Sequence, residues 1–182
     1  MKKSYTLVTL ACLHTLIGQA SVFADEISVD YQYTQSPQVD FSKATKGPLK
    51  LAVFTDARTV EDPRMLTEDL VEVPVADLVN DALKQAFVAG GASLVDQSER
   101  LTLEGEITEV AVSEKDGGFE VTIRTHVTLK RGSQSAFNTV IFGRASGQSL
   151  DQAVRATLDK LVNSLILDVA SPRYSRHSIA LH

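Results

Sequence analysis

The chain has 182 residues, a formal net charge of −5 at pH 7 and a single cysteine. The excess of acidic residues argues against a nucleic-acid-binding surface and against a polybasic membrane patch. A single cysteine forms no disulfide within the chain. The length suits one domain with a substantial core, which buries about two-thirds of the surface that the unfolded chain exposes.

The first 24 residues have the pattern of a secretory signal peptide. Lys2 and Lys3 make its start positive, an apolar run follows, and Val22-Phe23-Ala24 offers small residues at the −3 and −1 positions of a cleavage site. We expect cleavage before Asp25, which leaves a periplasmic or secreted chain of 158 residues with a formal charge of −7. The apolar run is too short to span a bilayer as a helix, which takes about 20 residues.

The cysteine, Cys12, lies inside this segment. The sequence TLAC at Thr9–Cys12 weakly resembles the box whose cysteine is acylated in bacterial lipoproteins. Thr9 stands where a leucine is expected, the apolar run before Cys12 is very short, and another apolar run follows it. We therefore interpret Cys12 as a small apolar residue of the signal peptide and keep lipid anchoring to the outer membrane as the alternative.

Residues 25–48 predict a lead-in strand and a linker. Every second residue from Ile27 to Tyr33 is apolar or aromatic, which is typical of a half-buried strand. The stretch QSPQVDFSKATKG that follows is polar and rich in turn residues, so we expect it to run over the surface.

The next strand, residues 49–58, carries apolar side chains on both faces: Leu49, Leu51 and Val53 on one, Ala52 and Phe54 on the other. Such a pattern indicates a central strand of the sheet. After a loop that ends at Pro74, apolar residues recur every three to four positions and predict an amphipathic helix over residues 75–89. Gly90-Gly91 provides its stop.

Three strands are predicted after the helix, over residues 101–112, 119–130 and 137–145. The alternation of the first loses its phase after Thr108, which suggests a bulge, and Asp116-Gly117-Gly118 suits a hairpin turn. The second has the cleanest alternation, with one apolar and one polar face. The third is apolar on both sides. A second amphipathic helix follows over residues 150–169, with Ser149 and Gln152 as a capping box.

Two helices with one apolar stripe each need one sheet face to cover. We therefore predict an α+β fold, a two-layer sandwich in which a mostly antiparallel sheet of about five strands carries two amphipathic helices on one face. The predicted division is a signal peptide at 1–24, a lead-in strand and linker at 25–48, a single domain at 49–171 and a loose tail at 172–182.

The segment after the 49–58 strand contains two Asp-x-Arg triplets. Asp56 and Arg58 point to the same face, where they could bind an anionic group or another chain, or lock the end of the strand, and we favour the structural role. Asp62-Pro63-Arg64 reads as a turn with a solvated Arg64. The acidic residues here lack the spacing and the glycine of a calcium loop, so we expect no metal.

The polar face of residues 119–130 is the other candidate site. Arg124, His126 and Lys130 form a mildly basic stripe that could bind an acidic partner or an envelope polysaccharide, although a solvated face has the same composition. The sequence contains no His-Glu-x-x-His, Gly-x-Ser-x-Gly or glycine-rich phosphate motif. We expect no catalytic residues and no cofactor.

The layout resembles the YajG-like family of small bacterial envelope lipoproteins, and more loosely the accessory lipoproteins of secretion and export systems. The resemblance rests on four stretches: ISVDYQYT, LAVFTDAR, VADLVNDALKQAFVAGGASLVD and LTLEGEITEV. It implies an accessory or structural envelope protein that works by contact with another envelope protein or with its own copies. Family members are generally anchored through a lipidated cysteine, for which this chain offers only Cys12.

Three functional hypotheses follow, and the least favoured of them is a hydrolase with a cryptic acidic site. The first is an exported, non-enzymatic accessory protein that contacts its partner through an exposed sheet face or edge. The second is a periplasmic protein that binds a small-molecule, lipid or polysaccharide ligand between the sheet and the helices.

Overall fold

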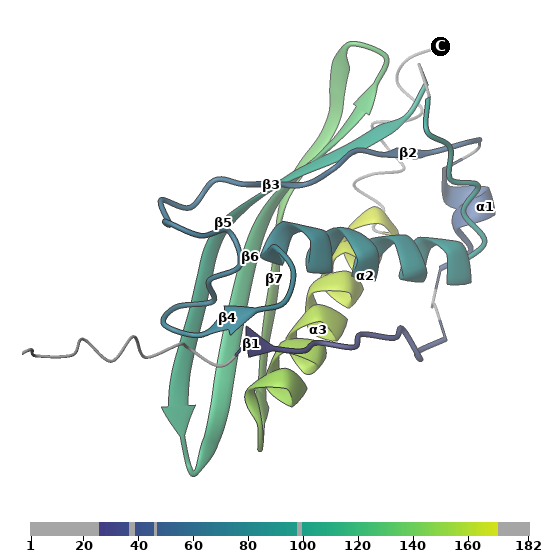
Figure 1. Cartoon of the computed structure of the whole chain (residues 1–182). Coiled ribbons are helices and arrows are strands. Elements are labelled where there is room, and N and C mark those ends of the chain that lie inside the picture. Colours follow the sequence, from purple (N-terminus) through teal and green to yellow (C-terminus); the bar gives the residue numbers. More distant parts are fainter. Residues whose placement is uncertain (1–25, 37–38, 46, 98–99, 171–182) are drawn as a thin grey trace, which may run out of the picture.

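The computed structural model describes residues 26–36, 39–45, 47–97 and 100–170. The expected signal peptide, Cys12 and the expected C-terminal tail therefore lie outside the described residues. Within them, a curled, mostly antiparallel sheet carries helices on one face, as predicted (Figure 1).

Three long antiparallel strands make up most of the sheet: β5 (Thr102–Lys115), β6 (Gly118–Arg131) and β7 (Gln134–Gly147). Asp116 and Gly117 join β5 to β6 with φ values of 52° and 79°. Two successive positive φ angles match the type I′ turn, whose twist suits a tight hairpin. The pairing of β5 with β6 shifts between Ile107 and Glu109, which confirms the predicted bulge.

The 49–58 segment lies at an edge of the sheet and not at its centre. It forms two short strands, β2 (Lys50–Leu51) and β3 (Thr55–Asp56), and both pair in parallel with β5. Leu51 pairs with Leu103 and Thr55 with Glu106, so the edge has one residue more than β5 between these pairs.

This extra residue reverses the predicted alternation of side chains. Val53, predicted to share a face with Leu51, is 70% exposed, whereas Phe54, predicted on the other face, is fully buried. The ring of Phe54 occupies the space above Gly105 of β5, where a Cβ atom would collide with it. Sequence periodicity assumes an unbroken strand, and therefore placed Val53 on the same face as Leu51.

The two long helices are α2 (Val75–Ala89) and α3 (Leu150–Ala170), with bounds within one residue of those predicted. Their apolar stripes are buried in one core together with the inner side chains of the sheet. Gly91, with φ of 80°, terminates α2. At Gly143 of β7 a Cβ atom would collide with the carbonyl oxygen of Thr157, so the missing side chain lets α3 approach the strand closely.

The lead-in segment crosses α3 and runs alongside α2 (Figure 1). Only β1 (Glu26–Ile27) forms a ladder, in parallel with β4 (Leu70–Val71). The predicted alternation of burial nevertheless continues to Tyr33. The Tyr31 hydroxyl donates to Asp159 Oδ1 of α3 at 2.9 Å, and the backbone N–H of Tyr33 donates to Gln85 Oε1 of α2 at 2.8 Å. Pairing with helix side chains replaces the expected strand.

The expected surface linker contains a short helix, α1 (Phe41–Ala44). Phe41 is completely buried, and its ring centroid lies 4.5 Å from that of Phe87 near the end of α2. Asp40 accepts a hydrogen bond from the N–H of Ser42 and caps the helix. The sequence did not predict the burial of Phe41, because one aromatic residue among polar residues creates no periodicity.

Candidate functional site

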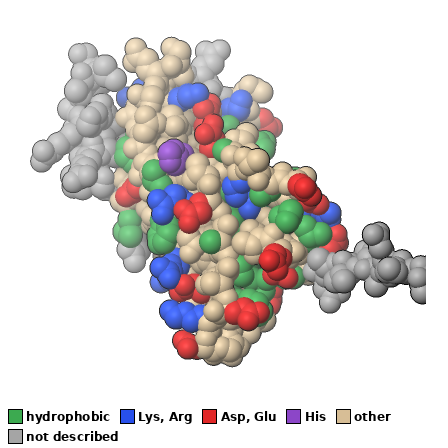
Figure 2. Space-filling view, turned by 90° about the vertical axis from the view of Figure 1, so that its left-hand side faces the viewer, with side chains coloured by type: hydrophobic (Ala, Val, Ile, Leu, Met, Phe, Trp, Pro, Cys, Tyr) green, Lys and Arg blue, Asp and Glu red, His purple; other side chains and the backbone are tan. Residues whose placement is uncertain are grey.

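The side chains of β5, β6 and β7 that point away from the helices form the outer face of the sheet. The predicted basic stripe lies here, but two acids of β5 pair with it: Arg124 Nε lies 3.0 Å from Glu109 Oε2, and Lys130 Nζ lies 2.5 Å from Glu104 Oε2. Charges of both signs are mixed over this face in Figure 2. Two of the three predicted residues are therefore neutralised by a neighbouring strand, which the pattern of one strand does not show. A binding role for Arg124, His126 and Lys130 stays a prediction.

Exposed apolar side chains lie among these ion pairs. Val140 and Phe142 of β7 are 46% and 42% exposed, and the Arg124 guanidinium carbon lies 5.8 Å from the centroid of the Phe142 ring. Such a cation–π contact holds the arginine over the ring without covering it fully. The prediction that this strand is apolar on both sides is correct, but only the inner side, with Ile141, is buried.

His126 stands beside a shallow groove on the same face. Its Cα is paired with those of Glu106 on β5 and Val140 on β7. The groove has a volume of about 410 Å³ and lies where the extra residue separates β2 from β3; it is lined by Ala52, Val53, Thr55, Glu104, Gly105, Glu106, His126 and Thr128. Sequence reasoning identified His126 but missed Val53 and Glu106, since both depend on the irregular edge.

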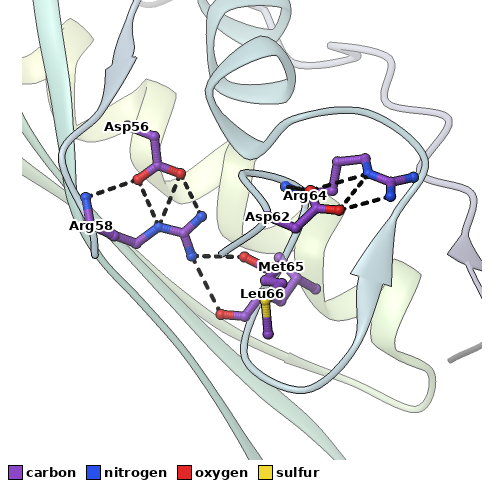
Figure 3. A network of polar contacts seen from close by, with 6 residues as sticks. All are labelled: Asp56, Arg58, Asp62, Arg64, Met65 and Leu66. Carbon is purple, nitrogen blue, oxygen red and sulfur yellow. Dashed lines mark hydrogen bonds and ion pairs between the residues drawn. The ribbon is translucent and has the colours of Figure 1, made fainter. Parts of the chain in front are cut away.

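The Asp56–Arg58 pair lies at the end of β3 and is almost fully buried (Figure 3). The two side chains are 10% and 7% exposed. Arg58 Nη2 donates to Asp56 Oδ2 at 2.6 Å and Nε donates to Oδ1 at 2.9 Å, while the backbone N–H of Arg58 donates to Oδ1 at 3.1 Å. Two residues therefore form a closed, bidentate ion pair.

The same guanidinium also holds the following loop. Nη1 of Arg58 donates to the carbonyl oxygen of Met65 at 2.8 Å, with that of Leu66 at 3.4 Å (Figure 3). Burial raises the pKa of Asp56, but the hydrogen bonds and charge of Arg58 outweigh it, so the pKa lies below its usual value. Each guanidinium nitrogen thus has a protein partner, which favours the structural role.

The second triplet repeats this geometry at the surface. The backbone N–H of Arg64 donates to Asp62 Oδ1 at 2.8 Å, and Nη2 donates to Oδ2 at 2.8 Å. Arg64 Nη1 contacts Glu26 of β1 at 2.5 Å, and the arginine is one-third exposed. Arg64 links the loop between β3 and β4 to β1. The expectation that Arg64 is merely solvated is therefore wrong.

The described part of the chain contains neither a cluster of metal-ligating side chains nor a helix that could span a membrane. No group of three or more His, Cys, Asp or Glu side chains is placed there to hold a metal ion. None of the described helices combines the length and apolar composition that a membrane span requires.

No model of a known protein family matches the chain, and no curated protein matches it. Several solved structures are similar. A Xanthomonas campestris protein described by the family model DUF330 has 17% identity and a TM-score of 0.54, over 80% of this chain and 92% of that one. This similarity shows a shared fold.

Two weaker similarities concern a hypothetical protein of Chlamydia trachomatis and a minor lipoprotein of Acinetobacter baumannii. The first has 7% identity and a TM-score of 0.49, over 72% of this chain and 97% of that one. The second has 14% identity and a TM-score of 0.45, over 69% and 94%. The YajG-like resemblance is not confirmed by these comparisons.

We predict that Asp56→Ala destabilises the protein strongly. Removal of one partner of a buried ion pair leaves an uncompensated charge, which costs about 3–5 kcal/mol in free energy of unfolding. The matched control is Asp62→Ala, which breaks the same local geometry where water reaches both partners, and we expect a much smaller loss. Urea denaturation measures both; equal losses would contradict the assignment.

The variant Asp56→Asn supplies the pH readout of this prediction. The folded-state pKa of Asp56 is lower than its unfolded value, so its contribution is complete above about pH 4 and is lost as the pH falls through the folded value. The difference in unfolding free energy between the protein and Asp56→Asn should therefore shrink on acidification. A constant difference down to acid pH would contradict this.

Proposed function

We propose that this chain is an exported, non-enzymatic accessory protein of the bacterial cell envelope that binds another envelope protein through the outer face of its sheet. The observation that carries the proposal is the position of Val140 and Phe142, exposed among cross-strand ion pairs on a face that α2 and α3 leave open. Aromatic and apolar side chains bordered by polar ones are typical of the core and rim of protein interfaces.

The ion pairs suit such a role. Arg124 and Lys130 are neutralised within the face, so an approaching partner meets little net charge there. Their side chains are nevertheless about half and two-fifths exposed, and each can still donate a hydrogen bond. Specificity would then come from the pattern of pairs, with affinity from Phe142 and its neighbours.

The groove beside His126 favours a second candidate function, the binding of a small ligand. Its lining offers two carboxylates, an imidazole and hydroxyl groups around the exposed Val53. A ligand with several hydroxyl groups, such as a sugar unit, would match these acceptors and donors. This site lies on the outer face, whereas the sequence hypothesis placed the ligand between the sheet and the helices.

Contact through the outer face predicts a site-specific cross-link. A photoreactive phenylalanine analogue at position 126 should give, in intact cells of the native host, an adduct with a different protein. The control position is Lys160, which is exposed on α3, on the helical side of the molecule. No adduct from position 126, or the same adducts from both positions, would overturn the proposed surface.

Export predicts the mass of the mature chain. Mass spectrometry of the protein from its native host should show an N-terminus at Asp25, as expected for a cleaved signal peptide. Purified periplasm is the fraction to examine, with the membrane fraction as control. A chain that begins at an acylated Cys12 would instead establish the lipid-anchored alternative.

A further inference from the structure

The last strand of the sheet, β7, has an open side. The strand order β2-β5-β6-β7 places it at the edge, paired with β6, and no strand within the described residues pairs with its other side. Alternate N–H and C=O groups of Asn138–Gly147 therefore point away from the sheet. An edge of this length can template the addition of another strand.

The two edges of the sheet differ in how they are protected. The β2–β3 edge has very short strands, an extra residue and the charged Lys50 and Asp56, all of which hinder pairing. β7 has 14 residues without lysine, proline, aspartate or glutamate. Its one charge, on Arg144, lies 2.5 Å from Glu120 of β6. Only the β7 edge is therefore suited to pairing.

We propose that β7 pairs antiparallel with β7 of a second copy of this chain, about a two-fold axis at Ile141. This inference rests on the fold and does not depend on the proposed function. In this register Val140 of one copy lies opposite Phe142 of the other, twice, and Asn138 lies opposite Arg144. The exposed apolar side chains of the two copies then lie side by side on the outer face, which stays open to another protein, and no like charges meet.

On the helical side of the sheet, this arrangement brings the two copies of α3 close together, because α3 packs directly on β7. A two-fold axis perpendicular to the sheet keeps α3 of both copies on the same side. Asp168 of α3 accepts a hydrogen bond from the Thr139 hydroxyl of β7 at 2.5 Å, and the adjacent Leu167 is 59% exposed. The exposed Leu167 of the second copy would thus approach the end of α3 of the first.

The uncharged strand predicts how association responds to a single lysine. Sedimentation of the purified full chain should show a monomer–dimer equilibrium with a dissociation constant of about 1–100 µM, as expected for a small interface. Val140→Lys should weaken it about tenfold or more, because lysine is a natural protector of edge strands. Val53→Lys, at the opposite edge and more exposed, is the matched control and should dimerise normally.

Disulfide formation tests the register. In a chain with Cys12→Ser, a mixture of Val140→Cys and Phe142→Cys proteins should cross-link faster than either alone, since only the mixture places opposed cysteines at the axis. A protein that stays monomeric over the whole range from about 0.1 µM to about 1 mM overturns the proposal. Equal weakening by Val140→Lys and Val53→Lys, or cross-links of Val140→Cys only with itself, does the same.

Discussion

The covering of one sheet face by α2 and α3 is the constraint on which the rest of the structure depends. Each helix has one apolar stripe, and both stripes lie in one core with the inner side chains of the sheet. α3 packs on β7 and β6, and α2 packs on α3 and β3. Gly143 permits this close approach, because any side chain there would strike the backbone of α3. One face of the sheet is thereby used for folding, and the other remains available for contact.

The two Asp-x-Arg triplets have the same local geometry but different structural roles, because one is buried and the other is partly exposed. In both, the aspartate accepts from the backbone and the guanidinium two residues later. The Asp56–Arg58 pair is buried, and Arg58 donates to the Met65 carbonyl oxygen, so this pair holds the loop between β3 and β4 in place. The Asp62–Arg64 pair is partly exposed to water, and Arg64 pairs with Glu26, so this pair joins the loop to β1 at the surface. In both triplets, every guanidinium nitrogen of the arginine has a hydrogen-bond acceptor within the chain.

The sequence predicted the parts of the fold that depend on an uninterrupted period. α2, α3 and β6 are long enough for the 3.6-residue or two-residue repeat to define both their bounds and their buried sides. Prediction failed at Val53, where one extra residue reversed the period, and at Phe41, whose burial depends on the end of α2. The charge balance of the outer face was missed for a different reason. Glu104 and Glu109 neutralise Lys130 and Arg124 only through the cross-strand register, which no single strand encodes.

The most direct test of one covered and one open face is the rate of thiol labelling along β6. In a chain with Cys12→Ser, single cysteines at the exposed positions 124 and 126 should react readily with a maleimide in the folded protein. Cysteines at 123, 125 and 127 should react only after unfolding, because the native side chains there are buried. Protection at the even positions, or rapid labelling at the odd ones, would contradict this account.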